Sequence, residues 1–282
     1  MIADAVLILG GTGLVFATFI ALANRKLKVW EDPRIDAVAA LLPQANCGSC
    51  GLPGCRAFAE KAVLGLIQPA KCTVSDPGKV AEIAAYLGVD AGEGVKRVAR
   101  LLCAGGADVA IQRAAYRGLG TCASATTVAA GGKGCVWGCL GLSDCAQVCT
   151  FDAIRMSATS LPVVDPDKCT ACGDCVEACP KGLFVLQPVD ERLLVQCKNL
   201  VAGDAPLASC RVACTACGKC VLDAPPGLIS VASGVAVIAD TGRDGATASA
   251  ASRCPTGAIV WLNGARQFDT SPVIRTRISE RV

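Results

Sequence analysis

The sequence predicts an α+β protein with a single N-terminal transmembrane helix followed by several small cysteine-rich units. Three observations lead to this prediction: an uncharged apolar run near the N-terminus, 20 cysteines among 282 residues, and the grouping of these cysteines into short motifs. Strand-like apolar segments and short helical stretches separate the motifs. The spacing of the motifs therefore defines both the domain organisation and the expected chemistry.

The composition excludes several classes of protein. The chain contains no histidine, which excludes His-based catalytic triads, mixed Cys/His zinc sites and Rieske clusters. A net charge of +3 and an aromatic content of 4% do not favour nucleic-acid binding. Several cysteines lie only two residues apart, where a disulfide between neighbours is disfavoured. The thiols are therefore predicted to stay reduced, in a reducing compartment, and to bind metal.

A membrane anchor is predicted over residues 5–23, a stretch without charged residues. As a helix it would be about 28 Å long, close to the hydrocarbon thickness of a bilayer. Asp4 precedes the stretch, and basic residues follow it at Arg25, Lys26 and Lys28. By the positive-inside rule, its C-terminal side faces the cytoplasm. A cleaved signal peptide is the alternative, but the basic residues lie on the wrong side of the apolar run.

The first cysteine motif has the spacing C-x2-C-x4-C-x16-C and comprises Cys47, Cys50, Cys55 and Cys72. Three interspersed glycines allow tight turns that bring backbone amides toward sulfur. A helix over 57–67 would return the chain so that Cys72 closes the site, and a short helix over 80–87 would end at Gly88. The motif predicts a [4Fe–4S] cluster, with structural zinc as the alternative.

The most diagnostic motif has the form C-x2-C-x2-C-x3-C-P and comprises Cys169, Cys172, Cys175, Cys179 and Pro180. This spacing is typical of bacterial ferredoxins, in which three closely spaced thiolates bind one cluster and the fourth reaches a second cluster. Zinc sites usually consist of two separated C-x2-C pairs, so zinc is a less favoured alternative, as are paired disulfides. The motif therefore predicts a partner motif elsewhere in the chain.

The partner motif lies upstream in a stretched form, C-x3-C-x5-C-x3-C, at Cys135, Cys139, Cys145 and Cys149. Thr150 follows the last cysteine, where proline is usual. Crossed fourth ligands, as in ferredoxins, define two predicted sets. These sets are Cys135, Cys139, Cys145 and Cys179 for one cluster, and Cys149, Cys169, Cys172 and Cys175 for the other.

The C-terminal part repeats the motif in a degraded form. Its cysteines are Cys214, Cys217, Cys220 and the more distant Cys254. Four ligand positions lack cysteine: Ala224, Asp244, Thr247 and Ala250. Crossed ligation assigns all four vacant positions to one cluster and the four cysteines to the other. The segment is therefore predicted to be a ferredoxin-like module that has lost one cluster and kept one.

Four cysteines remain outside these motifs: Cys103, Cys122, Cys197 and Cys210. They are enough for one further cluster, and Cys103 and Cys197 each end a strand-like apolar run. The alternatives are buried thiols that act as small apolar side chains, or a site closed by only some of the four. The sequence thus predicts four [4Fe–4S] clusters and leaves a fifth open.

The order of these features resembles the B subunit of the Rnf complex, a membrane-bound ferredoxin:NAD oxidoreductase that couples electron transfer to ion translocation. The related Rsx system has a similar subunit. The resemblance covers nearly the whole chain and is most specific at 46–55 and 134–145. It implies that soluble ferredoxin exchanges electrons with this chain and that other subunits carry the NAD and flavin chemistry. With the predicted anchor, it implies a single-pass protein of the bacterial cytoplasmic (inner) membrane, with its soluble part on the cytoplasmic side.

The prediction divides the chain into six segments. They are a transmembrane anchor (1–25), a linker (26–33), a small 4Fe–4S domain (34–94), a connecting segment (95–128), a two-cluster ferredoxin-like βαβ-βαβ module (129–187), and a one-cluster module with a tail (188–282). The predicted function is electron transfer within a membrane redox-driven ion pump, without a catalytic or nucleotide-binding site in this chain. The alternatives are an iron–sulfur subunit of a hydrogenase or formate dehydrogenase, and a zinc-holding structural module.

Overall fold

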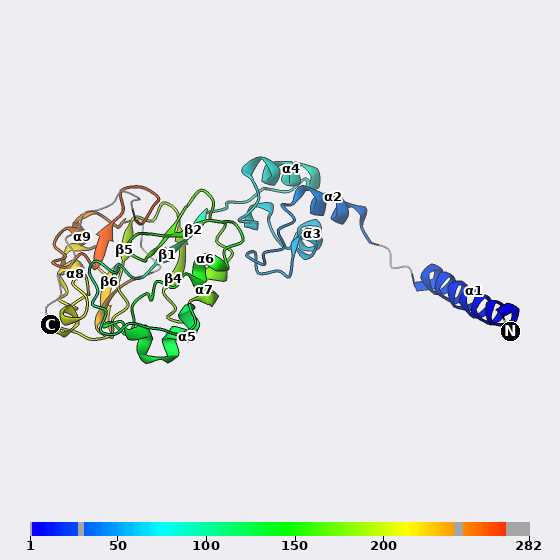
Figure 1. Ribbon diagram of the computed structural model, residues 1–282. Helices are drawn as coiled ribbons and strands as arrows, with labels where there is room; N and C mark the ends of the chain where they lie inside the picture. The colour runs from blue at the N-terminus through cyan, green and yellow to red at the C-terminus, as the bar shows by residue number, and fades with distance from the viewer. Residues whose placement is uncertain (1, 28–30, 240–244, 269–282) are drawn as a thin grey trace.

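The computed structural model describes residues 2–27, 31–239 and 245–268. These residues form a mixture of helices and short strands, as the sequence predicts. Figure 1 shows a long N-terminal helix, then a small unit of helices, and then a larger part that holds the described strands. The cysteines lie in the two latter parts, which therefore build the candidate sites.

Helix α1 (Ile2–Leu27) is long and apolar enough to cross a membrane. Its apolar stretch, Leu7–Lys26, has a mean hydropathy of 1.8 and none of it is buried. The hydroxyls of Thr12 and Thr18 donate to carbonyls one turn back at 2.8 and 2.7 Å, so both are satisfied within the helix. Lys28, one of the three basic residues behind the predicted orientation, lies outside the described residues.

The helical unit comprises α2 (Pro33–Leu41), α3 (Cys55–Val63), the 3-10 turn η1 (Pro69–Lys71) and α4 (Pro77–Leu87). Val38, Phe58 and Ile83 form the centre of its core, and each is at most 1% exposed. Burial of side chains of this size stabilises a fold by about 1.5–3 kcal/mol each. The members of this core all lie between residues 35 and 87, so the unit has a hydrophobic core of its own.

Local signals determine where these helices begin and end. The Asp76 carboxylate caps α4 by accepting from a backbone amide two residues on, and α4 ends at Gly88, whose φ of 66° is left-handed. The helices predicted over 57–67 and 80–87 are present, although both begin earlier and α3 also ends earlier. Helix α2, capped by Asp32, is an addition to the predicted elements.

The larger part contains two strand units with the same topology. The first strand unit consists of β1 (Arg97–Leu101), β2 (Ile154–Met156), β3 (Pro162–Val164) and β4 (Phe184–Pro188). The second strand unit consists of β5 (Leu193–Val195), β6 (Ile229–Ala232), β7 (Val235–Ile238) and β8 (Ile259–Trp261). In each unit the outer strands pair with each other and the inner strands form a hairpin, all antiparallel. The shared topology indicates an internal repeat.

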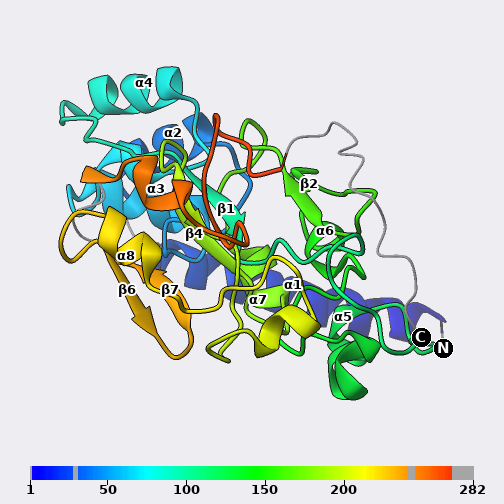
Figure 2. The same ribbon diagram turned by 90° about the vertical axis from the view of Figure 1, so that its left-hand side faces the viewer.

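Short helical segments connect these strands. They are α5 (Cys122–Thr127), η2 (Ala129–Gly132), α6 (Asp144–Gln147), α7 (Asp174–Ala178), η3 (Ala205–Ala208), α8 (Lys219–Asp223) and α9 (Ser249–Ser252). Figure 2 looks onto the end of the molecule that holds the second strand unit, where α8 packs beside the hairpin β6–β7. Each unit therefore carries its helices between an outer and an inner strand.

Strand β1 lies in the stretch that the sequence assigns to a connecting segment. It pairs with β4, and Leu101 is opposite Phe184, with both side chains buried. The first strand unit therefore begins at Arg97 rather than at residue 129. The partner strand lies far along the chain, so local sequence patterns do not reveal this pairing.

The last described residues tie the two strand units together. The Gln267 side chain bonds to the backbone amide and carbonyl of Leu101 at 2.8 and 2.6 Å, and it also reaches Gln196 at 3.3 Å. Arg266 forms an ion pair with Asp165 at 3.3 Å. Because Gln196 follows β5 and Leu101 ends β1, these bonds hold the two units in one arrangement.

Candidate iron–sulfur centres

Five hollows, each lined by four cysteines, account for all 20 cysteines of the chain. Their volumes are similar, about 320–390 Å³ including space that is open to solvent, and every thiol is free. They are site 1 (Cys47, Cys50, Cys55, Cys72), site 2 (Cys149, Cys169, Cys172, Cys175), site 3 (Cys122, Cys139, Cys145, Cys179), site 4 (Cys103, Cys135, Cys197, Cys210) and site 5 (Cys214, Cys217, Cys220, Cys254). Similar size and identical donors indicate one kind of group at all five.

The arrangement of thiols fits a cluster better than a single metal ion. Zinc bound to sulfur at about 2.3 Å draws four sulfurs to within about 3.8 Å of one another. Among the residues that the structure describes, no three potential ligands are close enough to hold one ion. A [4Fe–4S] cluster is larger and keeps its four thiolates further apart. The Thr170 hydroxyl, which lines site 2, is also buried without a partner in the described chain, so it is free to donate to a cluster sulfide.

Site 1 is built by a glycine-rich loop of the helical unit. Three glycines of this loop have positive φ values of 70°, 82° and 131°: Gly48, Gly51 and Gly54. A Cβ on Gly54 would lie 2.9 Å from the side-chain oxygen of Asn46, which accepts from the Cys55 amide at 2.9 Å. The Ser75 hydroxyl donates to the Cys72 sulfur at 3.3 Å. The glycine-rich loop is thus fixed by its own hydrogen bond to Asn46, and a hydroxyl from the segment after η1 donates to one of the thiols.

Sites 2, 3 and 5 use the same local structure for one of their cysteines. In each case a residue with left-handed φ precedes a short helix, and the cysteine is the second residue of that helix. The left-handed residues and the cysteines are Ser143 and Cys145, Gly173 and Cys175, and Gly218 and Cys220. All three cysteines are buried. The repeated loop supports a common mode of ligation at the three sites.

Cysteines cross between sites 2 and 3 in the manner of ferredoxins. Cys179, from the downstream motif, lines site 3, and Cys149, from the upstream motif, lines site 2. Backbone amides four residues further on donate to these sulfurs at 3.4 Å, from Leu183 to Cys179 and from Ala153 to Cys149. Amide hydrogen bonds to sulfur are among the features by which a protein sets the reduction potential of an iron–sulfur cluster. At site 2 the structure brings together the four predicted cysteines.

At sites 3 and 4 the structure exchanges two cysteines relative to the predicted sets. Cys122, expected among the four cysteines outside the motifs, lines site 3. Cys135, expected at that site, instead lines site 4 with Cys103, Cys197 and Cys210. The grouping of Cys135 with Cys139, Cys145 and Cys179 therefore differs from the geometry. Of the alternatives left open for the four remaining cysteines, the geometry matches a site closed by only some of them, namely Cys103, Cys197 and Cys210.

The widened spacing of the upstream motif explains the exchange. Between Cys135 and Cys139 the chain turns, and the Gly138 amide donates to the Cys135 carbonyl at 3.1 Å. With three intervening residues instead of two, this turn directs the two thiols into different hollows. The place at site 3 is taken by Cys122, because Asp144 accepts from the Cys122 amide at 2.8 Å and holds the start of α5 there.

Site 4 lies where the two strand units meet. Cys103 follows β1 and Cys197 follows β5, so each strand unit contributes a cysteine to this hollow. A Cβ on Gly105 would approach the Cys210 sulfur to 3.1 Å, which explains the glycine at this position. The Lys133 ammonium group also lines the hollow and donates to the Gly105 carbonyl at 2.5 Å. It places one positive charge beside these thiols.

Burial raises the pKa of several of these thiols and so makes them weaker acids. Desolvation raises the pKa of three thiols to about 12: Cys139, Cys145 and Cys175. It raises the pKa of Cys210 to about 11. Burial also opposes ionisation of Cys254, but hydrogen bonds led by the Ile259 amide outweigh it, and the pKa of Cys254 is lowered. Since iron binds thiolates, a cluster replaces the protons that these buried sulfurs otherwise keep.

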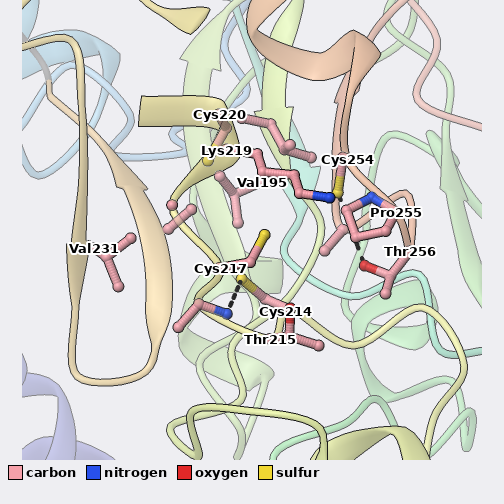
Figure 3. Close-up of a pocket in the computed structure, with 15 residues that line it drawn as sticks. Val195, Cys214, Thr215, Cys217, Lys219, Cys220, Val231, Cys254, Pro255 and Thr256 are labelled. Carbon is pink, nitrogen blue, oxygen red and sulfur yellow. Dashed lines mark hydrogen bonds between the residues drawn. The ribbon is translucent and has the colours of Figure 1, made fainter. Parts of the chain in front are cut away.

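Site 5 has an exposed cysteine. Figure 3 shows its four cysteines around one hollow: Cys214 and Cys217 come from the loop before α8, Cys220 from α8 itself, and Cys254 from the segment before β8. Cys217 is exposed, whereas the other 19 cysteines, all of them described, are buried or half-buried. Lys219 is also exposed and lines the same hollow. This end of the molecule therefore presents a candidate centre to solvent beside a positive charge.

Two of the vacant ligand positions in the second strand unit hold small apolar side chains that pack into its core. Ala224 and Ala250, two of the four vacant ligand positions, belong to the apolar cluster between α8 and α9. Arg253 joins the same helices through two hydrogen bonds to Asp223, of 2.7 and 2.5 Å. Asp244 lies outside the described residues. Vacant positions that meet in one core are consistent with the loss of a single shared cluster.

One buried charge lies close to site 2. Arg100, on β1, is only 2% exposed, and its guanidinium donates to the carbonyls of Ala265 and Val189. Burial lowers the pKa of Arg100, while the nearby Cys169 and Glu191 act in the opposite direction. Because a positive charge in a low dielectric favours the addition of an electron nearby, Arg100 is expected to raise the reduction potential of a cluster at site 2.

Replacing Arg100 with glutamine is therefore expected to lower the reduction potential of one cluster, by on the order of 50 mV. Potentiometric titration followed by EPR would measure this shift. Arg97→Gln is the matched control, because Arg97 lies on the same strand but is exposed to solvent, which screens its charge. Equal potentials in Arg100→Gln and the unmodified protein would contradict the assignment.

Two family models match the chain within these sites. A model described as "Putative Fe-S cluster" covers residues 42–74, which include all four cysteines of site 1. A model described as "4Fe-4S binding domain" covers residues 161–184, which include three cysteines of site 2. The chain therefore carries iron–sulfur binding regions in both the helical unit and the first strand unit.

The relatives decide the family. The B subunit of the proton-translocating ferredoxin:NAD(+) oxidoreductase complex of Clostridium ljungdahlii is 36% identical over 249 residues, which are 88% of each chain. This chain belongs to the family of Rnf B subunits. The B subunit of the Na(+)-translocating ferredoxin:NAD(+) oxidoreductase complex of Acetobacterium woodii is 45% identical over 206 residues, covering 73% of this chain and 62% of the relative. The B subunit of the ion-translocating oxidoreductase complex of Methanosarcina acetivorans is 34% identical over 209 residues, covering 74% and 79%. The resemblance seen in the sequence is thereby confirmed.

Proposed function

We propose that this Rnf-type B subunit carries single electrons through five [4Fe–4S] clusters within a membrane complex that translocates ions. The observation that supports this most is that residues of each four-cysteine site contact residues of the next site. When bound, such clusters accept and donate one electron at a time. The chain's own residues supply the thiolates, determine the spacing between sites, and shelter most of them from water.

Contacts between the sites support one order. Site 1 meets site 2 through two hydroxyl–carbonyl hydrogen bonds. Sites 2 and 3 share an apolar core that contains cysteines of both. The Cys139 amide of site 3 donates to the Cys103 sulfur of site 4 at 3.4 Å. The Cys214 amide of site 5 donates to the Cys197 sulfur of site 4, also at 3.4 Å. The proposed path therefore runs through sites 1, 2, 3, 4 and 5.

The two strand units are proposed to be ferredoxin-like modules, the first with two clusters and the second with one. Their repeated topology and the crossing of Cys149 and Cys179 support this interpretation. The fifth cluster, at site 4, would then lie between the modules. Its ligands are the three cysteines Cys103, Cys197 and Cys210 from outside the motifs, together with Cys135.

Helix α1 is proposed to anchor the chain in the bacterial cytoplasmic membrane with a single pass. Arg25 and Lys26 in its last turn support a cytoplasmic location for the sites. The relatives are named for different ions, Na(+) in Acetobacterium and protons in Clostridium, so the family does not specify the ion. Other subunits of the complex are proposed to carry the NAD and flavin chemistry.

Soluble ferredoxin is proposed to exchange electrons at site 5. Cys217 is exposed there, Lys219 provides a positive charge, and Leu222, 80% exposed, offers an apolar contact. Basic residues around an exposed centre attract an acidic electron carrier and accelerate its association. Electron exchange at this site is therefore expected to weaken as the ionic strength rises.

Charge reversal at Lys219 tests this docking site. In Lys219→Glu, the second-order rate of reduction by ferredoxin at low salt is expected to fall about two- to fivefold. Stopped-flow absorbance of the full-length protein would measure it, with Lys61→Glu, an exposed lysine of α3, as the control. Equal losses in both variants would contradict docking at site 5, and no electron transfer from ferredoxin to the unmodified protein would contradict the proposed function.

A further inference from the structure

Two hydroxyl groups connect the helical unit to the first strand unit. The Thr73 hydroxyl donates to the Thr170 carbonyl at 2.8 Å, and the Ser49 hydroxyl donates to the Ala171 carbonyl at 3.1 Å. The two hydroxyl oxygens also lie 2.7 Å apart, and since each hydroxyl carries one proton, either can donate to the other only in place of its carbonyl. Ser49 and Thr73 line the hollow of site 1, while Thr170 and Ala171 line that of site 2. The contact therefore joins the walls of two candidate centres.

Every residue in this contact is adjacent in sequence to a candidate ligand. Thr73 follows Cys72 and bonds to Thr170, which follows Cys169. In the same way, the Ser49 bond leads from a neighbour of Cys50 to a neighbour of Cys172. Two short paths thus lead from thiols of site 1 to thiols of site 2. Each path consists of covalent bonds and a single hydrogen bond.

The other neighbouring sites are held together in a different way. The core around Ile154 and Phe184 includes cysteines of sites 2 and 3, and it extends to Cys103 of site 4. By contrast, the core of the helical unit draws its members from residues 35–87, so it does not extend into the strand units. The position of site 1 against site 2 therefore depends on this polar contact rather than on a shared apolar core.

We propose that Ser49 and Thr73 are positioning residues that hold site 1 against site 2 for electron transfer. This inference rests on the proposed function, because it requires clusters at both sites. Removal of either hydroxyl leaves a carbonyl acceptor of the strand unit without its donor. The expected consequence is a less populated contact between the two units, with unchanged cysteine ligands and an unchanged environment at each sulfur.

EPR of the fully reduced, full-length protein tests the proposal, because two paramagnetic clusters held close together show magnetic coupling. The ratio of coupled to uncoupled site 1 clusters is expected to fall about fivefold in Thr73→Val and about thirtyfold when Ser49→Ala is added. Thr73→Ser keeps the hydroxyl and is expected to preserve the ratio. The reduction potential of site 1 is expected to stay the same in all three.

Ser75→Ala is the matched control. Ser75 lies in the same loop, but its hydroxyl donates to the Cys72 sulfur at 3.3 Å instead of crossing to site 2. Its removal is expected to lower the potential of site 1 and to leave the coupling ratio unchanged. A ratio that is unchanged in the double variant, or equally reduced in Thr73→Ser and Thr73→Val, would overturn the proposal. A wild-type protein without clusters at sites 1 and 2 would instead overturn the proposed function.

Discussion

Replacing Cys135 and Cys210 together by alanine is expected to remove one cluster, about four iron atoms per chain, as either single replacement does. The reason is that both cysteines line site 4, so the second replacement affects a site that is already empty. Replacing Cys122 and Cys210 together is expected to remove two clusters, about eight iron atoms, because Cys122 lines site 3.

This comparison separates the structure from the motif-based grouping of the cysteines. The motif-based grouping assigns Cys122 and Cys210 to one cluster and Cys135 to another, so it predicts the opposite pattern of losses. Iron and acid-labile sulfide of anaerobically purified full-length variants would be measured by colorimetric assay. Cys122→Ala combined with Cys145→Ala is the internal control, since both line site 3 and should remove one cluster. Loss of eight iron atoms from the Cys135/Cys210 pair would contradict the grouping at site 4.

Deleting residues 1–27 is expected to move the chain from the membrane fraction to the soluble fraction when it is produced without partner subunits. The apolar side chains of α1 are largely exposed, with Leu7 at 76% and Phe19 at 70%, and a bilayer around the helix would cover them. Since α1 contributes nothing to the described cores, the deletion is expected to leave the iron content unchanged.

The control for this deletion is Gly10→Ala. A Cβ at Gly10 meets nothing within 4 Å, and alanine favours the helix, so this variant should remain in the membrane fraction. Fractionation by ultracentrifugation, followed by immunoblotting and iron analysis, would measure both properties. A truncated chain that still sediments with washed membranes would contradict the role assigned to α1.

The chemistry of the cysteines could be predicted because loop spacing limits which thiols reach one cluster. Sites 1, 2 and 5 contain the cysteines that local spacing groups together, apart from Cys149 and Cys254, which crossed ligation in a ferredoxin topology predicts. Sites 3 and 4 could not be assigned in this way. Cys135 lines site 4 with Cys210 because the chain turns at Gly138. Cys122 lines site 3 because its backbone amide donates to Asp144, which is 22 residues further along the chain.

Long-range contacts were the least predictable part of the fold. Strand β1 has an apolar pattern, but nothing in that pattern indicates its partner, β4. The positioning of Arg100 beside site 2 follows from the same pairing. Ser49 and Thr73 are ordinary polar loop residues in the sequence, and their contacts appear only when the two units are placed side by side.

An iron and sulfide count on the anaerobically purified full-length protein tests the central claim most directly. Five four-cysteine sites that each hold a [4Fe–4S] cluster predict about 20 iron atoms and about 20 sulfides per chain, with little zinc. A count of about 16 iron atoms per chain would mean that one of the five sites holds no cluster. Site 4 would be the first to examine. Zinc in place of iron would contradict the electron-transfer account as a whole.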